Sequence, residues 1–324
     1  MNETIHAAPC NSNAIDEVKN VLSYLRELPG KGILTGQHTQ TTVQKELKYI
    51  EEVTGKLPAL CGFELLAYSP NINYEDAGEA CLIEVEENKN TLDNAWDWVL
   101  NKHGLITFTW HWFSPFGSRD KGFYTEHTTF DASQAVLEGT EEHARLIADM
   151  DHMAELLKPF CEKRIPILWR PFHESEGEWF WWGAKGPEVA KQLYRMMYLR
   201  YTHHHRLNNL IWVWNSPLPE GYVGDDVCDV ISLDTYPPKH THTDLEDEYN
   251  RLVKITPANK LTALGEIGVL PSIPRLSETH IPWVWYMTWS NEFGATEEWT
   301  TKEELRHAYG HPYSVTLDML PRLY

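Results

Sequence analysis

The sequence alternates eight short apolar runs with longer segments whose apolar residues recur at helical spacing, and this alternation limits the possible folds more than any other feature. The runs are rich in β-branched and aromatic residues, so each run with its following segment predicts one βα unit. Runs such as LIWVW and VISLD are apolar throughout, as expected of parallel strands covered by helices. Eight such units predict an α/β fold, a single (β/α)8 TIM barrel.

The expected elements can be assigned by residue number. The strands span residues 32–37, 58–64, 105–111, 166–173, 210–215, 230–236, 261–266 and 283–289. The helical segments include residues 43–54, 91–102, 141–161, 187–205, 244–255 and 302–308. Because no Gly/Ser-rich or Pro-rich stretch could link two domains, we expect one catalytic barrel domain over residues 1–324, with residues 1–15 as an N-terminal extension.

Charge and motifs restrict the partners. The chain has 28 Lys and Arg against 47 Asp and Glu, a formal net charge of -19, which argues against nucleic acid and favours a neutral ligand. Neither a glycine-rich dinucleotide-binding motif nor a P-loop motif occurs, so no cofactor is expected. The five cysteines show no metal-ligand spacing, and the apolar runs are far shorter than the ~20 residues of a membrane span.

Polar and aromatic residues follow every expected strand. In a TIM barrel the chemistry lies at the carboxyl ends of the strands, and the residues found there are Gln37, His38, Glu64, His111, Trp112, His173, Glu174, Asn215, Asp234, Tyr236, Glu266, Trp289 and Asn291. Glu174 and Glu266 close the fourth and seventh expected strands, which face each other across a barrel mouth. Two such glutamates can flank a glycosidic bond, with retention at a separation of about 5 to 5.5 Å and inversion at about 6.5 to 9.5 Å.

The chain also holds 14 tryptophans, many at the ends of apolar runs. Indole rings stack on the flat CH faces of sugars, although tryptophan also fills the cores of large domains.

An ordered set of motifs resembles glycoside hydrolase family 26, whose members are mostly β-mannanases with a (β/α)8 barrel and a retaining mechanism. The motifs are GILTGQH, FTWHW, RPFHE followed by WFWWG, NLIWVWN, LDTYPP and GEIG. The resemblance implies that Glu174 is the acid/base, that Glu266 is the nucleophile and that Tyr236 donates a hydrogen bond to Glu266. The aromatic neighbours of Glu174 agree with this division, because an acid must be desolvated to keep its proton, whereas a nucleophile needs donors.

The resemblance also implies a sugar-binding set. His111 and His173 look like the pair that holds sugar hydroxyls in the -1 subsite, with metal ligation as the rival interpretation. Trp179 would form part of the sugar-binding wall, Trp289 the platform under the -1 sugar, and Trp112 is assigned to the same set.

Three further residues or runs have structural interpretations. Asp234 would orient a neighbour in the site or form a cap or buried salt bridge. For Arg170 we expect a carboxylate partner, and we interpret His203 to His205 as a surface run at a helix end.

We therefore predict a retaining β-mannanase without metal or cofactor, which acts as a monomer on mannan, galactomannan or glucomannan. The same site would also suit an exo-acting mannobiohydrolase, a mixed-linkage β-glucanase or a β-1,3-xylanase, and residues 71–90 and 114–129 are expected to decide substrate choice. Alternatives of other classes are a non-catalytic carbohydrate-binding barrel and a metal-dependent hydrolase using His38, His111 and His173. The first residues, MNETIHAAPC, lack a signal core. An extracellular or cell-surface location is expected for a polysaccharide hydrolase, with a cytoplasmic one as the alternative.

Overall fold

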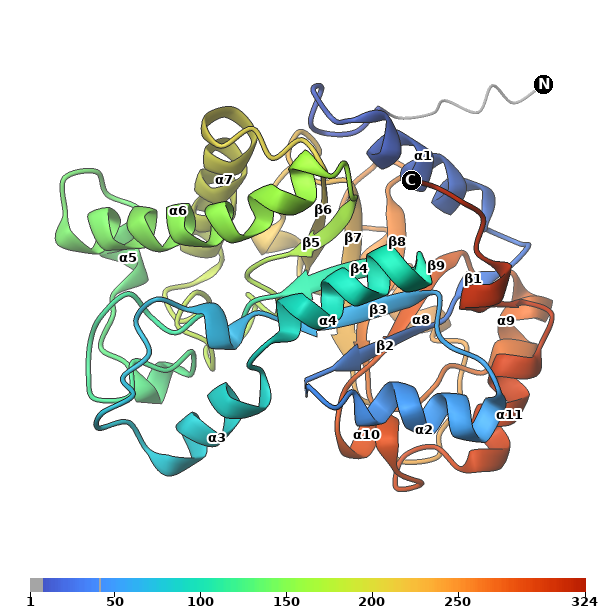
Figure 1. Cartoon of the computed structure of the whole chain (residues 1–324). Helices are drawn as coiled ribbons and strands as arrows, with labels where there is room; N and C mark the ends of the chain where they lie inside the picture. The colour runs from blue at the N-terminus through green and yellow to red at the C-terminus, as the bar shows by residue number, and fades with distance from the viewer. Residues whose placement is uncertain (1–7, 41) are drawn as a thin grey trace.

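The computed structural model describes residues 8–40 and 42–324, which form a closed barrel of eight parallel strands with helices between them (Figure 1). The first barrel strand is split at Thr35 into β1 (Ile33–Leu34) and β2 (Gly36–Thr39). The others are β3 (Leu60–Glu64), β4 (Leu105–Thr109), β5 (Ile167–Arg170), β6 (Leu210–Asn215), β7 (Val230–Thr235), β8 (Leu261–Ile267) and β9 (Trp283–Thr288). Strand β9 pairs with β8 and with β2, which closes the barrel, and β10 (Ser314–Val315) pairs with β1.

All eight predicted strands are confirmed, but several end earlier than predicted. Strand β4 ends at Thr109 and β5 at Arg170. His111, His173 and Glu174 therefore lie in the turns that follow these strands, where their side chains are free to face the barrel mouth.

The helices surround the barrel, as Figure 1 shows. They are α1 (Asp16–Glu27), α2 (Lys45–Thr54), α3 (Glu79–Glu87), α4 (Thr91–Asp97), α5 (Ala132–Ala135), α6 (Glu141–Glu162), α7 (Pro187–Leu199), α8 (Glu246–Leu252), α9 (Ile273–Thr279), α10 (Glu292–Ala295) and α11 (Lys302–Gly310). Helices α4 and α7 continue into π-helical turns at Trp98–Lys102 and Arg200–His204. Short 3-10 turns lie at Leu66–Tyr68, Thr125–His127, Pro219–Gly221 and Leu317–Met319. Each predicted helical segment contains a helix, while α1, α3, α5, α9 and α10 were not predicted.

Helix α1 covers the amino-terminal end of the barrel. Its apolar face, Val18, Val21, Leu22 and Leu25, belongs to the same buried cluster as Leu60, Leu105, Val230 and Leu261, the first residues of four strands. The segment before it also packs on the barrel, since the backbone N–H of Cys10 donates to Asp229 Oδ1 at 2.7 Å. Of the predicted N-terminal extension, residues 8–15 thus contact the barrel, and residues 1–7 lie outside the described residues. With this end closed, the carboxyl ends of the strands form the accessible mouth.

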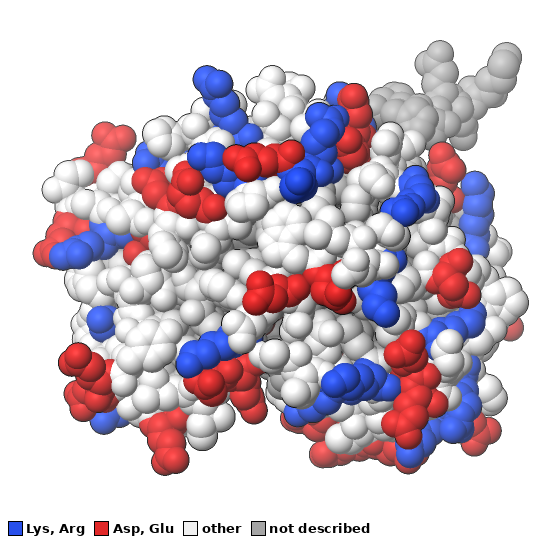
Figure 2. All heavy atoms as spheres, in the orientation of Figure 1, with Lys and Arg blue, Asp and Glu red and all other residues white. Residues whose placement is uncertain are grey.

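On the face shown in Figure 2, acidic and basic side chains are interspersed, with uncharged areas between them. Within residues 8–40 and 42–324, no helix is both long and apolar enough to cross a membrane.

Candidate active site

Glu174 and Glu266 meet at the carboxyl end of the barrel. Glu266 belongs to β8, and Glu174 lies in the turn after β5. One carboxylate oxygen of each, together with one of Asp234, lie within 4.8 Å of one another. This separation is shorter than the about 6.5 to 9.5 Å that leaves room for a water molecule in inverting glycosidases.

Glu266 is buried and held by two donors. The Arg170 guanidinium Nη2 donates to its Oε1, and the Tyr236 hydroxyl donates to its Oε2 at 2.8 Å. Arg170 also donates to Asp234 Oδ2 at 2.9 Å and to Thr109 Oγ1 at 3.2 Å. The expectation that Arg170 pairs with a carboxylate is thus confirmed, with two partners rather than one.

Glu174 has a different environment. Its Oε2 accepts a single side-chain hydrogen bond, from Trp179 Nε1 at 2.8 Å, and its backbone N–H donates to Asn215 Oδ1 at 3.0 Å. The backbone around it is strained, because both Phe172 and Glu174 adopt positive φ angles, 51° and 52°. Such conformations persist where the surroundings impose them, which is common at functional sites. Asn215 also donates to Asp234 Oδ1 at 2.7 Å, so one amide fixes the backbone of Glu174 and the side chain of Asp234.

These different partners act differently on the pKa values of the two glutamates. Burial, followed by the negative charge of Asp234, raises the pKa of Glu174 to about 7. Burial and Asp234 also raise the pKa of Glu266, but the Arg170 guanidinium opposes that rise. Because the two carboxyls interact, the first to ionise raises the pKa of the other. The two donors on Glu266 favour its ionised form, which leaves the shared proton on Glu174.

The two histidines form a chain that leads towards Glu266. Glu64 accepts from His111 Nδ1 at 2.7 Å, and His111 Nε2 lies 3.1 Å from His173 Nε2. His173 Nε2 in turn lies 3.9 Å from Glu266 Oε1. Although burial opposes it, the Glu64 carboxylate raises the pKa of His111, whereas burial and the charge of Arg170 lower the pKa of His173 well below its usual range. A neutral His173 beside a cationic or neutral His111 can hold sugar hydroxyls without a metal.

A cavity of about 290 Å³ adjoins His111, and neither Glu174 nor Glu266 belongs to its lining. Its wall includes His111 and Trp289 from the mouth, Glu84, Glu87 and Asn88 from the loop after β3, Phe123 and Tyr124 from the loop after β4, and Asn291, Glu292 and Phe293 after β9. Both loops that were expected to affect substrate choice thus border this cavity. No periodic pattern or motif in the sequence marks Phe123 and Tyr124, because they lie in an irregular loop.

The other predicted sugar-binding tryptophans differ in placement. Trp179 is 47% exposed beside Glu174 and Trp289 lines the cavity, whereas Trp112 is only 2% exposed. The Trp112 ring stacks on Trp110 with centroids 4.0 Å apart, and its Nε1 donates to Asp149 Oδ2 at 2.9 Å. Apolar packing and a buried carboxylate thus hold Trp112 in the core, away from the exposed Trp179.

His38 is likewise buried, with its ring 4.5 Å from that of Trp289 and its Nε2 3.3 Å from Thr109 Oγ1. Its ring thus packs against the Trp289 ring.

The chain matches the family model described as Glycosyl hydrolase family 26 over residues 10–319. It is 37% identical to a mannan endo-1,4-beta-mannosidase of Thermothelomyces thermophilus, over 95% of this chain and 62% of that protein. It is 29% identical to mannan endo-1,4-beta-mannosidase A of Piromyces sp, over 96% of this chain and 50% of that protein. The chain thus spans between half and two thirds of the length of these curated relatives.

Two solved structures show the same barrel. The Podospora anserina GH26-CBM35 beta-(1,4)-mannanase superposes with a TM-score of 0.87 at 35% identity, over 98% of this chain and 70% of that one. A beta-mannanase from a symbiotic protist of the termite Reticulitermes speratus, solved with a gluco-manno-oligosaccharide, superposes with a TM-score of 0.86 at 28% identity, over 97% of both chains.

Proposed function

Because the chain belongs to glycosyl hydrolase family 26, we propose that it is a retaining β-mannanase that cleaves β-1,4-mannosidic bonds within mannan, galactomannan or glucomannan. The observation that carries this proposal is the pair of glutamates with oxygens within 4.8 Å and unlike partners. The names of the relatives from Thermothelomyces thermophilus and Piromyces support the substrate.

In the first step, Glu266 Oε attacks the anomeric carbon of the -1 sugar while Glu174 gives its proton to the departing glycosidic oxygen. The C–O bond to the leaving sugar breaks and a covalent glycosyl-enzyme forms. Arg170 and Tyr236 keep Glu266 ionised and oriented until it attacks. Loss of its negative charge on bond formation then lowers the pKa of Glu174, which eases the proton transfer.

In the second step, the ionised Glu174 takes a proton from a water molecule, whose oxygen attacks the same carbon from the opposite side and releases Glu266. Two inversions give net retention. His111 and His173 would hold hydroxyls of the -1 sugar, Trp289 would stack beneath that sugar, and Trp179 would contact the sugar on the other side of the bond. Asp234 would act through Arg170 and Asn215, without touching substrate.

The roles of the two glutamates can be separated with a 2,4-dinitrophenyl β-mannobioside, whose leaving group needs no protonation. Glu174→Ala should still release dinitrophenol in a burst and then stall, whereas Glu266→Ala should show no burst. Added azide should restore turnover in both variants, with a β-glycosyl azide from Glu174→Ala and an α-glycosyl azide from Glu266→Ala. Unchanged mannan hydrolysis by Glu266→Ala would refute the assignment, and activity lost in EDTA would favour a metal-dependent hydrolase.

The substrate is tested by following products from linear β-1,4-mannan, galactomannan, mixed-linkage β-glucan and β-1,3-xylan over time. An early ladder of manno-oligosaccharides is the expected result. Mannobiose from the outset would indicate an exo-acting enzyme, and products only from glucan or xylan would retain the mechanism and overturn the substrate. No product from any polymer would favour a carbohydrate-binding barrel.

We further propose that the enzyme acts as a monomer outside the cell or on its surface. The substrate is a polymer too large to enter cells, and a net charge of -19 does not hinder contact with a neutral glycan.

A further inference from the structure

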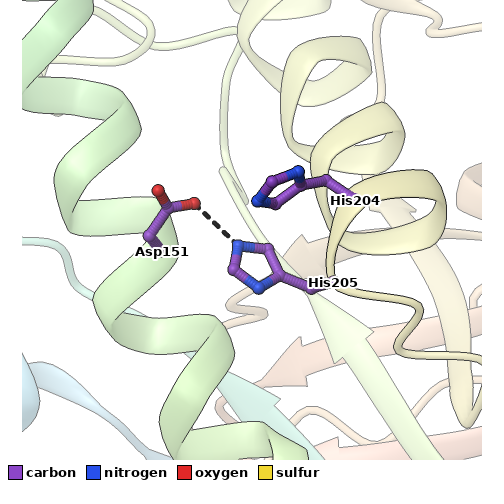
Figure 3. A group of neighbouring side chains, drawn as sticks. All are labelled: Asp151, His204 and His205. Carbon is purple, nitrogen blue, oxygen red and sulfur yellow. Dashed lines mark hydrogen bonds and ion pairs between the residues drawn. The ribbon is translucent and has the colours of Figure 1, made fainter.

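A second group of metal-ligating side chains lies outside the barrel, between α6 and the end of the π-helical turn that follows α7 (Figure 3). Asp151 comes from α6, His204 ends the π-helical turn, and His205 follows it. One ligand atom of each residue lies within 4.8 Å of the other two. His205 precedes β6 by a few residues, so the group lies on the amino-terminal side of the barrel, opposite the catalytic mouth.

We propose that Asp151, His204 and His205 form a surface site for a divalent transition-metal ion, with Zn²⁺ as the best fit. Two imidazoles and one carboxylate, with water in the fourth position, are a common donor set for Zn²⁺. Bond lengths of about 2.0 to 2.2 Å place tetrahedral ligand atoms roughly 3.3 to 3.6 Å apart. Asp151 Oδ1 and His205 Nε2 are already 2.7 Å apart, so rotation of the exposed His204 ring and slight opening of the Asp151–His205 pair would complete the geometry.

The surroundings orient two of the three ligands. Arg200 donates through Nε to Asp151 Oδ1 at 2.6 Å and through Nη2 to Oδ2 at 2.7 Å, which fixes the carboxylate. Glu155 Oε1 lies 3.7 Å from His205 Nδ1. When Nε2 of His205 binds the metal, its proton must reside on Nδ1, and Glu155 is placed to accept a hydrogen bond from it. A carboxylate behind the ligating imidazole is the usual outer partner of a zinc-bound histidine.

The charges set the strength of the site. Asp151 and Glu155 are two negative groups near the ion, while the Arg200 guanidinium is a permanent positive charge that opposes metal binding. We therefore expect a dissociation constant of about 1 to 50 μM, far weaker than that of the closed structural sites with four protein ligands. Because the ion would join α6 to the turn after α7, bound Zn²⁺ should stabilise the fold and leave catalysis unchanged.

The test is titration of the metal-free, untagged chain with ZnCl₂ by isothermal calorimetry at pH 7.5, together with thermal unfolding. The wild type should bind one Zn²⁺ and gain about 3 to 6 °C in Tm at a hundredfold excess over Kd. His204→Asn should weaken binding at least tenfold and, at the same Zn²⁺ concentration, lose at least half of the gain in Tm. His203→Asn is the matched control, because it removes a neighbouring histidine of the same turn and should behave like the wild type.

Asp151→Asn should also weaken binding, but it disturbs the Arg200 pair, so the exposed His204 is the decisive position. Equal affinities in the wild type and His204→Asn, or equal Zn²⁺-induced Tm gains in the two, would overturn the proposal. Neither measurement needs catalytic activity, so failure here would leave the proposed hydrolase function untouched.

Discussion

The Trp179→Phe substitution removes the indole N–H that donates to Glu174 Oε2 at 2.8 Å and keeps an aromatic ring at that place. A donor to a carboxylate favours its ionised form, so this bond lowers the pKa of Glu174 against burial and the charge of Asp234, which together raise it to about 7. Without the N–H, the pKa of Glu174 should rise further. The acid form of Glu174 should then persist to higher pH.

The size of this rise in the pKa of Glu174 depends on how far the Trp179–Glu174 hydrogen bond is exposed to solvent. A hydrogen bond to a charged group contributes about 1.5 to 3 kcal/mol when buried. Trp179 is 47% exposed, so we halve this value for solvent screening, to about 0.75 to 1.5 kcal/mol. At about 1.4 kcal/mol per pH unit, the alkaline limb should move upward by about 0.5 to 1 pH unit.

The assay measures kcat/KM for a manno-oligosaccharide between pH 5 and 9. The alkaline limb of this pH profile reports the pKa of the catalytic acid in the free enzyme. The wild-type limb should fall near the pKa of Glu174, about 7. Trp289→Phe is the matched control, since it alters a cleft tryptophan whose indole makes no hydrogen bond to Glu174, and it should change KM without moving the limb. A limb that stays in place or moves downward in Trp179→Phe would refute the reasoning.

Three further substitutions test other contacts. Tyr236→Phe removes the hydroxyl that donates to Glu266 Oε2 at 2.8 Å. Because a hydrogen bond to a charged group contributes about 1.5 to 3 kcal/mol, kcat should fall by about 10- to 100-fold. A normal kcat would contradict the role of the hydroxyl. Arg170→Met leaves Asp234 and Glu266 buried without their guanidinium and should cost about 3 to 5 kcal/mol in urea unfolding, with partial recovery in Arg170→Met/Asp234→Asn. Asp149→Asn should stabilise the protein increasingly as pH rises. Burial raises the pKa of Asp149 from 3.8 to about 6 in the folded protein. Because the folded pKa is above the unfolded one, the wild type loses about 3 kcal/mol of stability as pH rises through the range between these two values. Asparagine can still accept from Asn71 and Trp112, and parallel stability curves for the two proteins from pH 4 to 7 would contradict this account.

The parts of the fold that the sequence predicted are those with a strong local signal. Apolar runs such as Leu210–Asn215 and Val230–Thr235 predicted barrel strands, because parallel strands are buried on both faces. Helix α1 also carries a regular apolar stripe, Val18 to Leu25, but it precedes the first strand and so lies outside the alternation of βα units. Helix α3 could not be predicted, since its single buried residue is Val85 and it presents no apolar stripe.

The candidate site also has parts that a sequence signal predicts and parts that none predicts. Glu174, Asp234 and Glu266, predicted from their places at strand ends, lie close together, because the barrel brings the carboxyl ends of its strands to one rim. The burial of Trp112 could not be predicted, because alternation along β4 cannot show that the strand ends at Thr109 and that the Trp112 ring stacks on Trp110. The contact of Asp151 in α6 with His205, which follows the π-helical turn, joins residues 54 positions apart, and sequence spacing alone does not reveal it.

The different catalytic roles proposed for the two glutamates follow from the number of charged groups at the barrel mouth. Glu174, Asp234 and Glu266 are three carboxyl groups grouped around one permanent cation, Arg170. Desolvation makes three buried negative charges beside a single positive one unfavourable, so at neutral pH one carboxyl keeps a proton. Asp234 receives donors from Arg170 and Asn215, and Glu266 receives them from Arg170 and Tyr236, whereas Glu174 has only the indole of Trp179. The proton therefore resides on the least supported carboxyl, Glu174, which is the one that faces the exposed side of the cleft and would meet the glycosidic oxygen.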